Sequence, residues 1–575
     1  MTDNAIISKK PLLILAVTFY LILVSVQIGK PFIADEAEFV EMSANLYKNG
    51  TSSFGNCAIT QNLTAIDTAH GLWHPPLYVH MLSLVYYVLE VSEVSSRFLG
   101  IICAIISALL VYRIADRFLQ LGRWSVLAAV MTITSPIAIQ GSIIVDIDNT
   151  ILTTLNLLFI YAVLWMNEKN QWNMRGIFCL SIILSACFWT KILTQLLMLA
   201  SLFIFLLLQK GLRDAIRRMI LLCSFTLILL ASSWMAYSYL HQLSDCQTLY
   251  PFIHLYKTFK GQTDYSSSFT LLAKRTLTVV GWFFPQVLLL AAVGAYHRLK
   301  DFAVNRKAEP IDFLILYIAV VYATYSISAP PWGFPRYQYP LMGALCILAV
   351  ASLKRLNSEL LPTARLIAIS AVVLAYYLML GDPFLVYYTM KETLLENPGD
   401  TLGVYAKMLI QPLLFILPSI LLFALFKIGR RMDAIKAITL SLIIPAIMAG
   451  IAVDLVQAKA DYNTTYLYGE TGEAGVVAYL HTIAPSSRVL CQSKEIAFYL
   501  RGMDVSVNLD EKMLESRAKT VTLIGRENPD YIVIRAIRSA EDYSTTNDPE
   551  VKELLDSRYS KHLFGSFIVY ERRTI

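Results

Sequence analysis

The sequence predicts a polytopic α-helical membrane protein with about 13 spans and a small α/β domain at its C-terminus. The chain has 575 residues, of which 56% are hydrophobic and only 16% are charged, whereas about a quarter of a soluble domain is charged. Its apolar residues form long runs such as PLLILAVTFYLILVSVQIG, and a run of about 18 or more predicts a membrane span. From about Gln457 onward, charged and apolar residues mix.

The spans fill residues 1–456, and we read the first as a retained anchor because Lys9 and Lys10 precede it without a small-residue cleavage site after it. The expected spans lie near 11–29, 97–112, 122–138, 145–166, 176–189, 193–208, 219–239, 276–296, 311–327, 338–353, 364–380, 408–426 and 437–456. Alternate loops and the N-terminus hold about 22 Lys or Arg in roughly 78 residues, and the other loops about 11 in roughly 150. This asymmetry predicts an inner-membrane protein with a cytoplasmic N-terminus and an outer C-terminal domain.

The first outer loop, 31–96, is expected to carry two helices in the membrane interface. Its first helix has three apolar residues at helical spacing, Phe39, Met42 and Leu46. Its second, 75–91, is apolar enough for a marginal span, but counting it as one would invert every later loop and remove the charge asymmetry. We therefore place it along the outer surface.

The C-terminal segment, 457–575, is expected to form a separate outer domain. EAGVVAYLHTIAP and KEIAFYLRG are typical of helices, and SRVLCQ, DYIVIRA and FGSFIVYERR of strands. This alternation predicts an α/β fold of about 110 residues.

Charge and cysteine content exclude some functions. The net charge of +6 reflects loop topology and does not indicate nucleic-acid binding. The eight cysteines show no metal-ligand spacing. Cys57 and Cys246 fall in outer loops, so a disulfide between them is a hypothesis.

Acidic residues open the first interfacial helix. Asp35 and Glu36 begin it, and Glu38 and Glu41 follow, which is more negative charge than a helix N-terminus needs. The pKa of a carboxylate at a membrane boundary is readily shifted by burial and by neighbouring charges. Asp35 is therefore a candidate general base, with Glu36 beside it as a second catalytic candidate.

Further charged residues occur on the same side of the membrane. Asp146 and Asp148 lie at the outer end of a span, where ionisable residues are often functional. Lys191 and Arg336 lie in outer turns and suit a phosphate at headgroup level, although either would also serve as an interface anchor. We assign Asp146 to the catalytic candidates, and Asp148, Lys191, Arg336 and the adjacent Tyr337 to substrate binding.

His74 and Arg97 complete the candidate site as substrate-binding residues. His74 precedes two prolines that fix an extended turn, and Arg97 opens the second span in SSRF. A divalent metal held by Asp35, Glu36 or His74 stays open, because this ligand set is not distinctive.

Several motifs recur together in a known group of enzymes. They are DE after the first span, HPPL about 40 residues later, SSRF at the second span, an Asp at the fourth, TK between the fifth and sixth, and RY near the tenth. In these motifs, over about 1–345, the chain resembles the GT-C membrane glycosyltransferases of the protein O-mannosyltransferase and lipid A aminoarabinose transferase superfamily.

The resemblance implies inverting transfer of a sugar from a polyprenyl-phosphate donor on the outer face, with Asp35 at the catalytic acidic position. His74 matches the HPP of protein mannosyltransferases. The aminoarabinose transferases have a Glu-Lys pair where this chain has Trp73 and His74, and an Arg where it has Glu38. These departures argue against aminoarabinose and lipid A as substrates.

The function that the sequence predicts is therefore glycosyl transfer beside membrane lipids, with a glycan, lipid or protein as acceptor. The alternatives are a transporter or flippase of lipid-linked substrates and a non-catalytic assembly protein. Transporters place charges near the bilayer midplane and often show repeated halves, whereas here the charges crowd one face and no repeat is visible.

Overall fold

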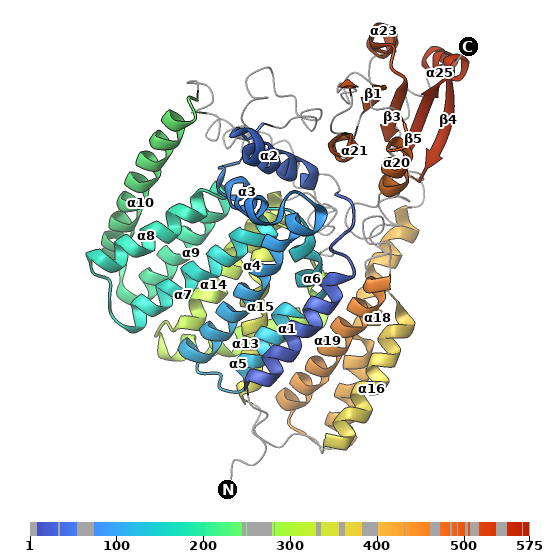
Figure 1. The fold of residues 1–575 in the computed structure, drawn as a ribbon. Coiled ribbons are helices and arrows are strands. Elements are labelled where there is room, and N and C mark those ends of the chain that lie inside the picture. The colour runs from blue at the N-terminus through green and yellow to red at the C-terminus, as the bar shows by residue number, and fades with distance from the viewer. Residues whose placement is uncertain are drawn as a thin grey trace.

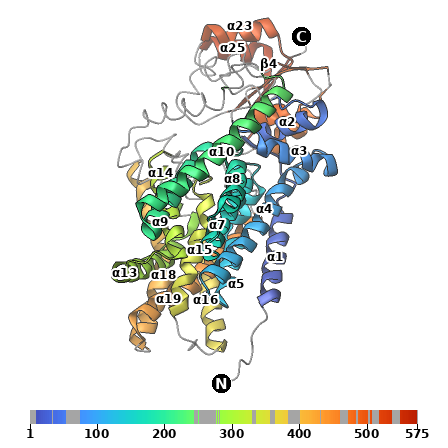
Figure 2. The same ribbon diagram turned by 90° about the vertical axis from the view of Figure 1, so that its left-hand side faces the viewer.

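A computed structural model shows a helical bundle with a five-stranded sheet region beyond one of its ends (Figure 1). It describes residues 9–32, 35–53, 74–243, 249, 276, 279–280, 282–328, 335–355, 363–381, 401–429, 432–459, 472–483, 486–491, 493–500, 504–506, 517–535, 549–565 and 567–573. Helices α2 and α3 lie at the same end of the bundle as the sheet, opposite the N-terminus (Figures 1 and 2). We call this end the sheet-side end.

The helices of the bundle match the apolar runs of the sequence. They are α1 (Lys9–Ser25), α4 (Glu93–Arg113), α5 (Trp124–Ile133), α6 (Pro136–Ile143), α7 (Thr153–Glu168), α8 (Met174–Phe188), α9 (Ile192–Lys210), α10 (Leu212–Leu240), α13 (Pro285–Asn305), α14 (Pro310–Ser328), α15 (Met342–Ala351), α16 (Thr363–Leu380), α18 (Thr401–Ala424) and α19 (Ala434–Lys459). Within the described ranges, seven helices are long and apolar enough to cross a membrane, or eight if α5 and α6 form one span. Five shorter apolar helices accompany them. The chain is a multi-pass α-helical membrane protein.

Short turns of other helix types extend several of these helices. They are η2 (Ile114–Phe118), η3 (Asp148–Leu152), η4 (Tyr339–Leu341), η5 (Ser352–Arg355) and η6 (Leu425–Gly429).

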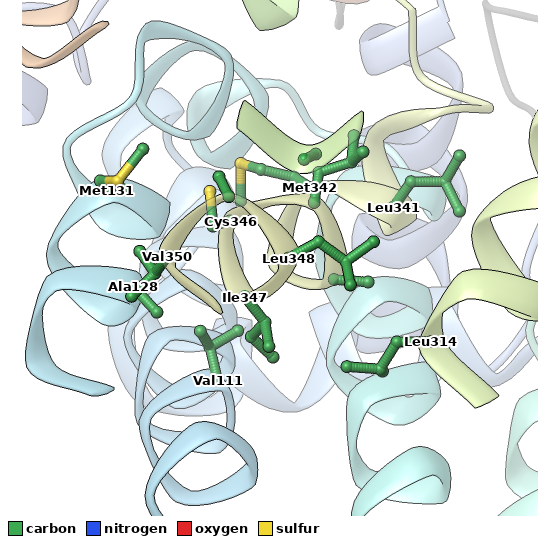
Figure 3. Packing of buried hydrophobic residues seen from close by; sticks show 14 of the residues in the cluster. Val111, Ala128, Met131, Leu314, Leu341, Met342, Cys346, Ile347, Leu348 and Val350 are labelled. Carbon is green, nitrogen blue, oxygen red and sulfur yellow. The ribbon is translucent and has the colours of Figure 1, made fainter. Parts of the chain in front are cut away.

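Helix α15 lies inside the bundle, and Figure 3 shows its apolar side chains, such as Met342 and Ile347, packed among those of neighbouring segments. All nine residues from Met342 to Val350 are buried, and a helix that is apolar all round is stable only inside a protein or membrane. It packs against α13, α5 and α14. Cys346 is buried within this core, where a free cysteine behaves as a small apolar residue.

One expected span, 122–138, is broken in the structure. Helices α5 and α6 meet at an angle of 49°. The break follows from Ser135 and Pro136, because Pro136 has no N–H to continue the helix and the Ser135 hydroxyl accepts the N–H of Ala138 at 3.3 Å. Helix α6 thereby turns toward the candidate site.

Helix α6 approaches α4 closely at Gly100. A Cβ atom at this position would lie 2.0 Å from the backbone oxygen of Ser142, so any larger residue would force the two helices apart. The close packing sets Arg97, one turn earlier on α4, beside the carbonyl of Ile143.

The first loop forms two helices at the sheet-side end, α2 (Asp35–Asn49) and α3 (Leu77–Leu89). They pack on one another, and the three residues expected on the apolar face of α2 are buried, as predicted. The sequence did not indicate that Glu36, Glu38 and Glu41 are also buried. Cys57, Cys246 and Trp73 lie outside the described residues.

The C-terminal sheet has the strand order β2-β1-β3-β5-β4. Strands β2, β1 and β3 are parallel, and β3, β5 and β4 are antiparallel. The strands are β1 (Arg488–Cys491), β2 (Asp504–Ser506), β3 (Tyr531–Arg535), β4 (Tyr559–Phe564) and β5 (Phe567–Arg572). The helices of this region are α20 (Glu473–Leu480), α21 (Lys494–Tyr499), α23 (Arg517–Glu527) and α25 (Pro549–Arg558). The small α/β fold that the sequence predicted is confirmed.

Low pH is expected to destabilise this sheet through protonation of Glu571. Its carboxylate accepts hydrogen bonds from Tyr479, His562 and Tyr531, and the bond from Tyr479 contributes most to lowering the pKa of Glu571 below its ordinary value of 4.5. The stabilisation is complete above pH 4.5 and is lost as the pH falls through the lower folded-state pKa. The melting temperature of the sheet, followed by circular dichroism, should fall at acidic pH. This fall should be smaller in Glu571→Gln. Equal pH profiles would contradict this assignment.

Candidate active site

The centre of the candidate site is a guanidinium shared by two carboxylates. Nη1 of Arg336 donates to Oδ2 of Asp35 at 2.9 Å and to Oδ2 of Asp146 at 2.8 Å. About a quarter of the side chain is exposed for Asp35 and Arg336, but only 5% for Asp146. Asp35 and Arg336 are therefore open to a substrate, while Asp146 lies behind them.

A second ion pair lies beside the first. Nζ of Lys191 donates to Oδ2 of Asp148 at 2.5 Å, and it also lies 4.3 Å from the ring centroid of Tyr337. The Arg336 guanidinium lies 5.2 Å from the same ring. Both cations thus lie within reach of the Tyr337 ring, and each gains from the negative face of an aromatic ring.

The two ion pairs are joined through the backbone that precedes η3. The N–H of Asp148 donates to Oδ1 of Asp146 at 2.9 Å. The hydroxyl of Thr150 donates to the carbonyl of Asp146, and that of Thr153 to the carbonyl of Asp148. The first of these bonds satisfies a backbone N–H at the start of η3, where N–H groups lack partners within the helix, and it fixes the carboxylate of Asp146.

Glu36 and Arg97 bind backbone groups of the segments that precede Asp35 and Asp146. Oε1 of Glu36 accepts the N–H of Val145, next to Asp146, at 2.9 Å, and Oε2 lies 3.4 Å from Arg97. Arg97 is only 3% exposed. Its guanidinium also donates to the backbone carbonyls of Ile28, Lys30, Pro31 and Ile143. Both side chains thus bind protein groups, and the catalytic role expected for Glu36 and the substrate-binding role expected for Arg97 stay predictions.

His74 lies at the start of α3, close to the turn that carries Lys191. The N–H of Leu77 donates to the carbonyl of Trp189 at 3.1 Å, which holds the HPPL turn against the loop between α8 and α9. His74 itself is half-buried. The sequence therefore identified a segment that borders the site.

Sequence reasoning missed Asn149. It is 2% exposed, and neither polar atom of its amide has a hydrogen-bond partner among the described residues. Its position directly after Asp148 in the DIDN motif was the available signal, but an Asn beside two acids is also common in turns.

The residues of the site do not fit a resident metal ion. Within the described part of the chain, no group of three or more His, Cys, Asp or Glu side chains is arranged to hold one. Arg336 lies between the carboxylates of Asp35 and Asp146, and the oxygens of Glu36 are bound by Val145 and Arg97. Each of these three carboxylates therefore already accepts a hydrogen bond from a protein N–H group.

An apolar groove opens beside the turn that carries Lys191. It has a volume of about 410 Å³. Pro75 and Trp189 line one part of it, next to His74 and two residues before Lys191 in the chain. The remaining lining residues come from α8, α9 and α10: Phe188, Ile192, Leu196, Leu199, Cys223, Thr226, Leu227, Leu230, Ala231 and Trp234.

Known proteins share features with this chain. The family of dolichyl-phosphate-mannose-protein mannosyltransferases matches residues 73–237. The structure is similar to ArnT from Cupriavidus metallidurans bound to undecaprenyl phosphate, with 14% identity, a TM-score of 0.59 and 98% of each chain covered. It is also similar to the apo state of that ArnT, with 15% identity, a TM-score of 0.57 and the same coverage. No curated protein sequence matches the chain.

The chain is a membrane protein with the fold of the GT-C glycosyltransferases. The match over residues 73–237 is to the family of dolichyl-phosphate-mannose-protein mannosyltransferases, one of the groups that the motifs of the sequence resemble.

Proposed function

We propose that this protein is an inverting glycosyltransferase that moves a sugar from a polyprenyl-phosphate donor to a hydroxyl group of a glycan, lipid or protein. The observation that carries the proposal is Asp35, a partly exposed carboxylate held 2.9 Å from Arg336 and near a second cation, Lys191. A base beside cations is what transfer from a phosphate-linked sugar requires. Undecaprenyl phosphate bound to the ArnT of similar fold supports the class of donor.

The proposed reaction has three coupled changes. Asp35 takes the proton of the acceptor hydroxyl, and the resulting oxygen attacks the anomeric carbon. The bond between that carbon and the phosphate oxygen breaks on the opposite face, and the phosphate leaves with its electron pair. Arg336 and Lys191 stabilise the charge that develops on it.

Asp35 and Asp146 share Arg336, and we expect donor binding to release Asp35 from this ion pair so that it can act as the base. While the guanidinium binds both Asp35 and Asp146, one oxygen of Asp35 is engaged. A donor phosphate that bonds to Arg336 competes with Asp35 for its N–H groups, which frees that oxygen to accept a proton. The hydrogen bond between the N–H of Asp148 and Asp146 keeps the second carboxylate in place.

The reaction is assigned to the outer face of the inner membrane. In the expected topology, Lys and Arg are concentrated in the cytoplasmic loops, and the loops at the sheet-side end lie on the opposite side of the membrane. The site lies at the end of the bundle that faces the sheet, away from the N-terminus (Figure 1). Labelling of single cysteines at positions 35 and 336 by a membrane-impermeant reagent in intact cells tests this assignment.

The direct test is a reaction of the purified protein with a panel of polyprenyl-phosphate sugars and candidate acceptors. Mass spectrometry of the products should show cleavage of the bond between sugar and phosphate, and NMR coupling constants of the product should show an inverted linkage. A flippase would move the intact donor across a vesicle membrane without cleaving it. Movement without cleavage, across the whole panel, would overturn the proposal.

Filling the apolar groove should weaken binding of long donors. We propose that the prenyl chain lies in this groove, because the groove is apolar and is lined in part by Pro75 and Trp189, which lie close to His74 and Lys191 in the chain. Leu230→Trp should raise the KM for a long-chain donor about 10-fold or more, since each buried CH₂ of a ligand contributes about 0.8 kcal/mol. A donor with a chain of one or two isoprene units should be affected less.

The control for this variant is Ile228→Trp on the same helix. Ile228 is 63% exposed and does not line the groove, so its KM values should equal those of the wild type. An equal effect of Leu230→Trp on long and short donors would place the prenyl chain elsewhere.

A further inference from the structure

The sheet region contacts the segment that leads into α2, the helix that begins at Asp35. The hydroxyl of Tyr499, at the end of α21, accepts the N–H of Phe32 at 2.7 Å. The ring of Phe32 stacks on Tyr499 with centroids 6.1 Å apart and meets Phe498 edge-on at 5.2 Å. Phe32 is 1% exposed. Helix α21 also packs on α2, so the contact extends beyond one residue.

The same segment is held by the helical bundle. Arg97 of α4 lies 5.2 Å from the ring centroid of Phe32, and it donates to the carbonyls of Lys30 and Pro31. Three residues after Phe32 comes Asp35, and Glu36 is fixed by the N–H of Val145. Asp35 therefore lies between an anchor supplied in part by the sheet region and an anchor supplied by the bundle.

We propose that Tyr499 is a positioning residue, through which the C-terminal α/β domain holds Asp35 at the distance from Arg336 that transfer requires. This proposal rests on the function proposed above for Asp35. It gives the C-terminal domain a part in catalysis that does not require it to touch the substrate. A change in the docking of this domain would then change the rate of transfer.

The Tyr499 hydroxyl is suited to this role because it joins α21 to the segment before α2 by accepting the N–H of Phe32. Burial and the charge of Glu93, in the first turn of α4, raise the pKa of Tyr499, so the hydroxyl keeps its proton at neutral pH. A phenylalanine would keep the ring contacts and remove this hydrogen bond.

Hydrogen exchange of the full-length protein in lipid nanodiscs tests the contact without any substrate. In Tyr499→Phe, the amide of Phe32 and those of the first turns of α2 should exchange about 3- to 10-fold faster, the range expected for the net loss of one hydrogen bond. The matched control is Tyr479→Phe, because its hydroxyl is likewise hydrogen-bonded, to the Glu571 carboxylate at 2.8 Å, but within the sheet region. That variant should leave exchange in 28–46 unchanged.

Turnover separates positioning from a structural role. Measured with the polyprenyl-phosphate sugar that the wild type uses, Tyr499→Phe should lower kcat about 5-fold or more with little change in the donor KM and in the melting temperature. Tyr479→Phe should keep the wild-type kcat. Unchanged exchange in 28–46, or faster exchange with unchanged kcat, would overturn the proposal. If the wild type turns over no donor, the proposed function fails, and exchange alone decides whether Tyr499 orders the segment.

Discussion

Replacing Asp35 by Asn should lower kcat for glycosyl transfer about 10²- to 10⁴-fold, the usual contribution of a general base. Asn has nearly the same shape and keeps an oxygen that can accept from Arg336, so binding of the donor should change little. The substitution is also expected to leave the fold intact, because a quarter of the Asp35 side chain is exposed. Turnover of the purified variant and its melting temperature, measured on the same preparation, check both parts.

The matched control is Asp530→Asn. Asp530 also pairs with an arginine, Arg572, and both side chains are about one-third exposed, but the pair lies in the sheet region. Its turnover should equal that of the wild type. Full turnover of Asp35→Asn would show that Asp35 is not the base. If the acceptor were an anionic phosphate oxygen, which needs no base, the loss would fall well below 10²-fold.

Replacing Arg336 by Met should lower kcat about 10²- to 10³-fold, the usual cost of removing one donor that stabilises transition-state charge. It should also destabilise the protein, because the buried carboxylate of Asp146 loses this partner. Removal of one member of a fully buried ion pair costs about 3–5 kcal/mol. A smaller cost is expected here, because a quarter of Arg336 is exposed to solvent.

A second substitution separates these two effects of Arg336. Arg336→Met combined with Asp146→Asn should recover most of the lost stability without recovering transfer. Arg117→Met serves as the control, since Arg117 pairs with Glu168 at an exposed site, with side chains 33% and 41% exposed. It should change neither property measurably. Recovery of transfer in the double variant would show that Arg336 acts only by neutralising Asp146.

Much of the fold could be predicted because apolar runs and loop charges are local signals. Every expected span contains a helix, and β1, β3 and β5 lie where SRVLCQ, DYIVIRA and FGSFIVYERR predicted strands. Strand β2 was missed because it has only three residues. Strand β4 was missed because its sequence, YSKHLF, is largely polar, which suits an edge strand with one exposed face.

The candidate site could be predicted in part. The expected topology set Asp35 and Arg336 at one end of the bundle, and the structure joins these residues, 301 positions apart, by a hydrogen bond. No sequence pattern gives that distance. The roles of Glu36 and Arg97 were harder to predict, because whether a charged side chain faces substrate or backbone depends on packing. The contact of Gly100 with Ser142 is one such feature.

The charge balance of the site bears on how the reaction ends. Four carboxylates (Asp35, Glu36, Asp146 and Asp148) surround three cations (Arg97, Lys191 and Arg336), so the fully ionised cluster carries a surplus negative charge. The proposed donor is a phosphate diester with one negative charge, whereas the phosphate monoester left behind carries about −1.5 to −2 at pH 7. In the proposed reaction Asp35 is neutral directly after it takes the acceptor proton, so the surplus returns only when that proton leaves. The pocket then repels the spent carrier more strongly than an incoming donor, which couples release of the carrier to deprotonation of Asp35.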